Sequence, residues 1–318
     1  MCQLSETDMD KFLMSMPVII LPIERVPKKV IIVVSIILLG TFLTALASSI
    51  IIGFWKGTVS EEAVPAKESE MGAQASIINM LYFVVIVLVV TFVIVMLIKY
   101  GKFNIIRMFM VSVVVLMIFS FTQMMVALYQ LYIVVMLYSL GYSVVVWWVE
   151  FILPISLVFV CIFTIIYVMS VAKAKYINAR NIILILNAIW AAVWLAWSSG
   201  ILSPVMILIG MALYDLYSVF RGPLRDLADV IVSRGEGRGE DIGIIVGLGD
   251  IFFYSFAIAY SYAVLGIIEA IVVIVILLVG AILTFMLLLK FENRALPALP
   301  IPILSAVTFI IVFLYIVR

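Results

Sequence analysis

Apolar runs long enough to cross a lipid bilayer recur along the whole chain and limit its possible folds more than any other feature. As an α-helix, about 20 apolar residues span the roughly 30 Å hydrocarbon core of a membrane. Hydrophobic residues make up 67% of the 318 positions, and charged residues only 12%. A helix also satisfies its own backbone hydrogen bonds, as lipid requires. The sequence therefore predicts an all-α, multi-pass integral protein of the cell membrane.

Clusters of lysine and arginine indicate which ends of these runs face the cytoplasm. They fit nine crossings, with the N-terminus in the cytoplasm and the C-terminus outside. We interpret the aromatic-rich piece 129–148 as an extended or interfacial excursion on the outer side. The predicted spans are about 30–54, 75–98, 105–127, 151–172, 182–197, 201–220, 243–263 and 267–289, followed by a last one that ends at residue 318.

The chain contains no histidine and only two cysteines, Cys2 and Cys161. Without an imidazole it builds neither a serine–histidine pair nor a pair of histidine zinc ligands one helical turn apart. Two chemical routes to peptide hydrolysis inside a membrane are thereby excluded, and the sequence predicts no metal and no cofactor. The net charge of +1 gives no electrostatic basis for binding nucleic acid.

Two aspartates, Asp215 and Asp250, fall within predicted spans. An ionised aspartate at the bilayer centre costs ~2.5 to 3.5 kcal/mol on insertion scales, so each is a functional candidate. A short polar loop, 221–241, joins the two spans, which makes them antiparallel neighbours whose carboxyls can meet at a similar depth. In apolar surroundings mutual repulsion leaves one proton on such a pair, which then resembles the acid and base of an aspartic protease.

Glycines and prolines accompany these acids in the sequence. Gly247 and Gly249 precede Asp250 and remove side-chain bulk, which lets a neighbouring helix or an extended peptide approach the backbone. Taken alone, such a glycine pair is more typical of simple helix packing, whereas its place beside an intramembrane aspartate favours a role in the site. Pro297 and Pro300 mark either an ordinary turn before the last span or a segment left unwound at membrane depth.

Three ordered motifs resemble those of the presenilins, a family of GxGD aspartyl intramembrane proteases. YD at 214–215 and RGPLR at 221–225 resemble the sixth span of the family and the segment behind it. GLGDIFFYS at 247–255 resembles the seventh span, and ALPALPI at 295–301 resembles the stretch that contains the PAL motif. The YD and GLGD motifs are also similar to those of signal peptide peptidases, whereas the surrounding residues favour the presenilin branch.

The resemblance implies a presenilin-like fold and a catalytic dyad of Asp215 and Asp250, which uses a water to hydrolyse peptide bonds within transmembrane helices of other proteins. It divides the chain into a scaffold of about five helices, 1–198, and a catalytic part, 199–318. The implied partners are helical membrane substrates and the lipid bilayer, and a homo-oligomer is left open. The residues implied to bind substrate are Tyr214, Gly247, Leu248, Gly249, Pro297, Ala298 and Leu299.

A substrate helix hides its peptide bonds and must unwind before water attacks them. We expect a backbone edge at 297–299 or 242–246 to hold the unwound segment by strand addition. The loop between the acids lacks the long, self-cleaved insertion of eukaryotic presenilins, so we expect an intact single chain. Its small size and Ile/Val-rich spans indicate an archaeal homologue.

A proton or cation transporter or channel is the main alternative, because intramembrane acids also bind protons and cations. The sequence shows no repeat of one half in the other, a feature of many transporters. An inactive helix-binding scaffold is a third reading. A protease needs both carboxyls and releases fragments, whereas a transporter moves ions without cutting.

Overall fold

The structure, a computed structural model, describes residues 18–21, 27–54, 64–172, 176–221, 244–290 and 297–317. Its helices are α2 (Pro27–Phe54), α3 (Glu68–Met71), α4 (Ala73–Lys99), α5 (Phe103–Met117), the π-helical η1 (Ile118–Thr122), α6 (Gln123–Ser139), the 3-10 helix η2 (Ser143–Phe151), α7 (Ile152–Ala172), α8 (Ile177–Trp197), α9 (Ser203–Phe220), α11 (Leu248–Val264), α12 (Ile267–Lys290) and α13 (Pro300–Val317). The strands are β1 (Val18–Leu21) and β2 (Ile244–Gly247).

Seven helical stretches among the described residues are long and apolar enough to cross a membrane. Two shorter apolar helices, α11 and α13, complete the bundle. The 17 residues of α11 reach only about 25 Å as a helix, which is shorter than the hydrocarbon core of about 30 Å. The count of nine crossings and the sides of the two termini stay predictions.

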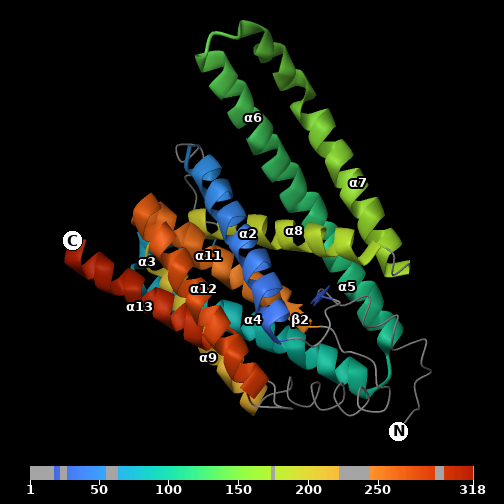
Figure 1. Cartoon of the computed structure of the whole chain (residues 1–318), viewed down its shortest axis with the longest axis vertical. Helices are drawn as coiled ribbons and strands as arrows, with labels where there is room; N and C mark the ends of the chain where they lie inside the picture. Colours follow the sequence, from blue (N-terminus) through green and yellow to red (C-terminus); the bar gives the residue numbers. More distant parts are fainter. Residues whose placement is uncertain are drawn as a thin grey trace.

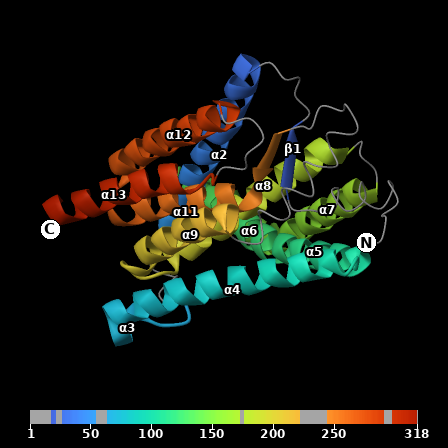
Figure 2. The ribbon, with the colours of Figure 1, turned by 90° about the horizontal axis from the view of Figure 1, so that it is seen from below.

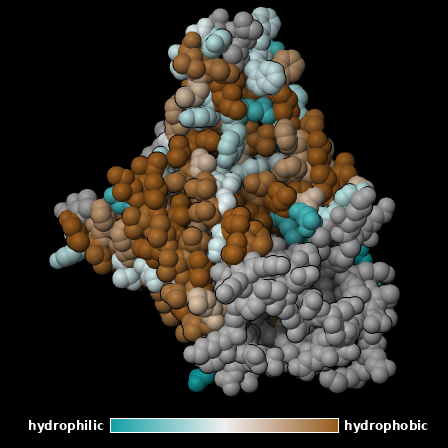
Figure 3. Space-filling view, viewed as in Figure 1, coloured by the Kyte–Doolittle hydropathy of each residue, from teal (hydrophilic) through white to brown (hydrophobic). Residues whose placement is uncertain are grey.

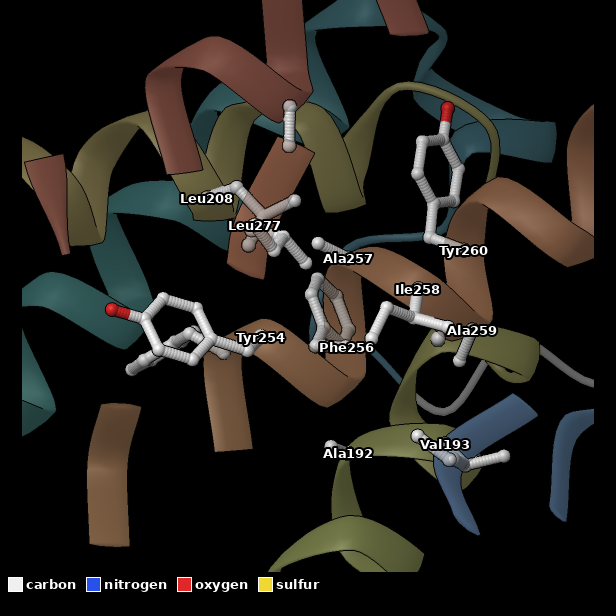
Figure 4. Packing of buried hydrophobic residues seen from close by; sticks show 14 of the residues in the cluster. Ala192, Val193, Leu208, Tyr254, Phe256, Ala257, Ile258, Ala259, Tyr260 and Leu277 are labelled. Atoms are coloured by element: carbon white, nitrogen blue, oxygen red, sulfur yellow. The ribbon is translucent and has the colours of Figure 1, made fainter. Parts of the chain in front are cut away.

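Helices α8 and α11 form the centre of the bundle, and α2 packs against both of them (Figure 1). Every residue of α11 from Phe253 to Ser261 is buried. Its small residues Ala257 and Ala259 let neighbouring helices approach closely. Figure 4 shows Phe256 of α11 within this core, together with Leu208 of α9 and Leu277 of α12.

The outer helices present apolar side chains on their outward faces. Helix α4 lies along the edge of the bundle beside α9 (Figure 2), and most of its side chains are at least partly exposed. On the face of the molecule seen in Figure 1, Figure 3 shows brown, apolar surface over most of the described residues. A water-soluble domain would bury this surface, so the arrangement is that of a protein surrounded by lipid.

The excursion predicted for 129–148 is wrong. Helices α5, η1 and α6 form one continuous helical stretch, and η2 follows after a tight turn. Gly141, at a φ of +93°, makes this turn, and the amide of Tyr142 donates to the carbonyl of Leu137 as in a glycine-ended helix. No glycine or proline stands between 104 and 140, so nothing in that stretch ends the helix earlier.

Two short strands depart from the all-α prediction. β1 and β2 pair in antiparallel register, with Val18 opposite Gly247 and Leu21 opposite Ile244 (Figure 2). The crossing predicted to begin as a helix near residue 243 therefore begins as a strand, and its helix starts at Leu248. The sequence alone does not predict this pairing, because the two strands lie far apart along the chain.

Candidate active site

Asp215 lies on α9, within the last two turns of that helix. The helix begins at Ser203 with Pro204 in its first turn, where a missing amide leaves no hydrogen bond unmade. Oδ2 of Asp215 accepts a hydrogen bond from the main-chain amide of Leu299, with a donor–acceptor distance of 3.0 Å. The carboxyl group is therefore tied to the segment that precedes α13.

The segment 297–299 is not helical, and α13 begins at Pro300. The carbonyl of Leu299 accepts the amide of Ile303 at 3.0 Å, so Leu299 stands at the start of the helix with its own amide outside the helical ladder. A buried amide without a partner is costly, and Asp215 supplies the acceptor. Both interpretations of the prolines allow a non-helical segment before α13, so the choice between an ordinary turn and a segment unwound at membrane depth stays a prediction.

Asp250 lies in the first turn of α11, where the helix dipole favours a carboxylate. A Cβ atom added at Gly247 would stand 2.9 Å from its Oδ2, so the carboxyl group lies directly against the glycine backbone. The φ of Gly247 is −66°, which any residue adopts, so space is what this position requires. An electrostatic interaction between Asp250 and Asp215, which lie on separate helices, indicates that the two acids are near each other.

Tyr254 joins this group, although sequence reasoning did not select it as a site residue. It follows Asp250 by four positions on α11 and therefore lies on the same face of the helix. Its hydroxyl donates a hydrogen bond to the carbonyl oxygen of Ala298 at 2.8 Å. The only sequence signal for it was the FFYS run, in which nothing distinguished this tyrosine from a core residue.

The other predicted substrate-binding residues have different surroundings. The hydroxyl of Tyr214 donates to Oγ1 of Thr91 at 2.9 Å, which ties α9 to α4 beside the aspartate. Leu248 is partly buried and packs against the core. A Cβ at Gly249 would meet no atom of the described residues within 4 Å, so among them the space in front of this residue is open. Contact of these three residues with a substrate stays a prediction.

A carboxylate outside the spans anchors the far end of α9. Glu68 of α3 accepts hydrogen bonds from the amide of Leu202, at 2.9 Å, the amide of Ser203 and the hydroxyl of Ser76, at 3.0 Å. Partial burial by itself raises the pKa of Glu68, but these hydrogen bonds outweigh it and hold the pKa below its usual value. Glu68 thus acts as an N-terminal cap for α9, supplied by another part of the chain.

The arrangement offers two carboxyls from two helices, one buried peptide group between α9 and α11, and open space beside Gly249. A close carboxyl pair is suited to general acid–base chemistry, in which one group accepts a proton and the other donates one. The predicted residues that the structure brings together are Asp215, Asp250, Gly247, Ala298 and Leu299. The loop 222–243 lies outside the described residues, and most of the RGPLR motif lies within it.

Comparison with known proteins relates the chain to presenilins. Residues 233–318 match the family model described as Presenilin. Presenilin-B of Dictyostelium discoideum is 35% identical over 114 residues, which cover 32% of this chain and 24% of that protein. The chain therefore matches about a quarter of the length of this curated relative.

Two solved structures share the fold, and both are of a presenilin family intramembrane aspartate protease. The structure in the C222 space group has a TM-score of 0.54 and 19% identity, and covers 88% of this chain and 99% of that one. The structure in the P2 space group has a TM-score of 0.50 and 18% identity, with coverages of 88% and 96%. The predicted relation to presenilins is confirmed, whereas the likeness to signal peptide peptidases and the archaeal source stay predictions.

Proposed function

We propose that this relative of the presenilins is an intramembrane aspartyl protease that hydrolyses peptide bonds within the transmembrane helices of other proteins. The observation that carries the proposal is that one peptide group bonds to both helices with membrane carboxyls: the Leu299 amide donates to Asp215 on α9, and the Ala298 carbonyl accepts Tyr254 of α11, the helix of Asp250. The two similar solved structures are of a presenilin family intramembrane aspartate protease, and what they share with this chain is the fold.

In the proposed reaction a water molecule lies between the two carboxyls. Asp215, already accepting the Leu299 amide, is the ionised base that takes a proton from the water. Asp250 carries the proton and donates it to the oxygen of the scissile carbonyl as the water oxygen bonds to the carbon. As this diol collapses, the C–N bond breaks, the nitrogen takes up the proton from Asp215, and one diol hydroxyl returns its proton to Asp250. A new carboxyl and a new amine then leave the site, and the two aspartates regain their starting protonation states.

The substrate segment must be extended when it reaches the acids. Of the two backbone edges expected to hold it, the one at 297–299 is already used: the amide of Leu299 bonds to Asp215, and the carbonyls of Ala298 and Leu299 bond to Tyr254 and Ile303. β2 remains, with β1 along one edge. We therefore assign substrate pairing to the other edge of β2, next to Gly249 and its open space.

The division into a scaffold, 1–198, and a catalytic part, 199–318, belongs to the same proposal. All the carboxyl, tyrosine and main-chain groups assigned to catalysis come from the second part. The first part contributes supports, such as Thr91 for Tyr214 and Glu68 for the start of α9. Assembly into a homo-oligomer stays a prediction.

A cleavage assay tests the proposal. Purified protein in detergent is mixed with a tagged single-span substrate, alongside the variants Asp215→Asn and Asp250→Asn, and fragments are identified by mass spectrometry. Glu269→Gln, which neutralises a carboxyl at the start of α12, is the matched control. Fragments cut within the span by the wild type and by Glu269→Gln, but by neither aspartate variant, would support the proposal.

Absence of fragments from every form, across several substrates and pH values, would overturn it. The alternative, a proton or cation transporter that uses the same carboxyl pair, would then be tested by ion flux into liposomes. In that case flux depends on Asp215 and Asp250 while no peptide bond is cut.

A further inference from the structure

One peptide group, between Ala298 and Leu299, bridges the two helices that carry the acids. Its carbonyl accepts the hydroxyl of Tyr254 on α11 at 2.8 Å, and its amide donates to Asp215 on α9 at 3.0 Å. In a trans peptide group the C=O and N–H point in opposite directions. The bridge is therefore a rigid spacer with one catalytic helix bonded at each end.

We propose that Tyr254 is a positioning residue: through this peptide group it sets the orientation of the Asp215 carboxyl relative to Asp250. The proposal rests on the proteolytic function proposed above. Tyr254 and Asp250 are one helical turn apart on α11, so the hydroxyl fixes the bridge to the helix that supplies the second acid. The hydrogen bond that the Ala298 carbonyl accepts also polarises the peptide group, which makes the Leu299 amide a stronger donor to Asp215.

The surroundings of Tyr254 support a fixed geometry. Its exposed fraction is only 3%, and its ring meets that of Phe42 of α2 edge to face, with centroids 5.9 Å apart. The ring therefore has little freedom to turn, and the hydroxyl is held at the end of a packed side chain. Replacement by phenylalanine keeps this packing and removes the hydrogen bond alone.

Tyr260 provides a matched control on the same helix. It is 1% exposed, and its hydroxyl donates to the main-chain carbonyl of Ile201, away from the acids. Figure 4 shows Tyr254 and Tyr260 on either side of Phe256, with their hydroxyls pointing in different directions. Tyr254→Phe and Tyr260→Phe thus each remove one buried hydroxyl that bonds to the backbone, and only the first removes one at the bridge.

The experiment compares both variants with the wild type by steady-state cleavage and by hydrogen–deuterium exchange. For Tyr254→Phe we expect kcat to fall about tenfold with little change in KM, because a misoriented base weakens the transition state more than substrate binding. We expect faster exchange of the main-chain amides in 297–303 in this variant. Tyr260→Phe should keep the wild-type kcat and wild-type exchange in that segment.

Equal kcat and equal exchange in Tyr254→Phe and Tyr260→Phe would overturn the positioning role. If Tyr254→Phe does not fold, 3-fluorotyrosine at position 254 replaces it: this stronger donor of nearly the same shape should slow exchange in 297–303, and unchanged exchange there would overturn the proposal. The exchange measurement does not depend on proteolysis. A wild type that cuts nothing would therefore refute the proposed function while the bridge is still tested.

Discussion

The main-chain amide of Leu299 donates a hydrogen bond to Oδ2 of Asp215, so a residue of the C-terminal helix region holds a carboxyl of α9 in place. For Asp215→Asn we expect cleavage to fall by roughly 10²- to 10⁴-fold or more, because the proposed general base is lost. The asparagine side-chain oxygen still accepts the Leu299 amide, so the melting temperature should stay close to that of the wild type. A large drop in melting temperature would show that the negative charge itself supports the fold.

The two glycines before Asp250 should respond differently to alanine. Gly247→Ala places a methyl group 2.9 Å from Oδ2 of Asp250, so the carboxyl must move and kcat should fall at least about tenfold. Gly249→Ala meets no atom within 4 Å, so its fold should be unchanged and only KM or the choice of cleavage site should shift. Melting curves and kinetics of both variants check this, and equal losses of kcat would contradict it.

Helix α12 packs closely against the start of α13, and this packing should help to hold Leu299, the residue before α13, in position. A Cβ at Gly280 would lie 2.7 Å from Cα of Pro302, so Gly280→Ala must push the start of α13 away. We expect about 1 to 3 kcal/mol of destabilisation together with reduced cleavage. In Gly40→Ala the new methyl group meets nothing within 4 Å, and this exposed position in α2 should gain about 0.5 to 1 kcal/mol. Thermal unfolding in detergent distinguishes the two.

Stability should fall at acidic pH through Glu68. The pKa of Glu68 is lower in the folded protein than its usual value of 4.5, so the ionised group stabilises the fold above that value. This stabilisation is lost as the pH falls through the lowered pKa. Wild-type melting temperature should therefore drop as the pH falls below about 4.5, partly because of this group, and Glu68→Gln should show a shallower dependence.

Glu70, on the same short helix, is the control for Glu68. Among the described residues its carboxylate pairs with the exposed Lys67, at 3.8 Å, and such surface pairs contribute little. Glu70→Gln should follow the wild-type pH dependence. If Glu68→Gln and Glu70→Gln weaken the pH dependence of the melting temperature equally, the cap on α9 is not the source of that dependence.

Proline substitutions in β1 should test whether the strand pair supports substrate binding. A two-stranded sheet is marginal by itself, so β1 stabilises the extended form of β2 to which a substrate would add a third strand. Successive residues of a strand direct their amides to opposite edges, so only one of Ile19 and Ile20 donates toward β2. Of the variants Ile19→Pro and Ile20→Pro, the one that removes the amide directed toward β2 should raise KM. The other removes an amide directed away from β2 and serves as the control. Unchanged KM in both would contradict the role of β1.

The sequence predicted the chemistry of this site better than its geometry. Two aspartates in apolar spans stand out because lipid penalises charge, and the motifs around them led to the confirmed relation to presenilins. Tyr254 carries no such signal, since a tyrosine in an apolar helix is usually a packing residue. Its role becomes visible only when the distant Ala298 carbonyl is placed against it.

Some differences between the predicted and the observed elements have a local cause in the sequence. Gly141 is a helix-ending glycine, and it sets the true end of the helical stretch that was cut short near 127. The side chain of Leu299 is only 5% exposed, so a bulky polar residue there would disturb packing as well as any contact with substrate. The strand pair depends on contacts between the two ends of the chain, which no local window contains.

The pairing of β1 with β2 also has a consequence for the order of synthesis. Val18–Leu21 leaves the ribosome early and finds its partner strand only after residues 22–243 have been made. The Ala298 carbonyl and the Leu299 amide that complete the bridge come later still. A nascent chain thus inserts most of the helices described above before its acids are aligned, and the ability to cut begins only after residues 298 and 299 have been made.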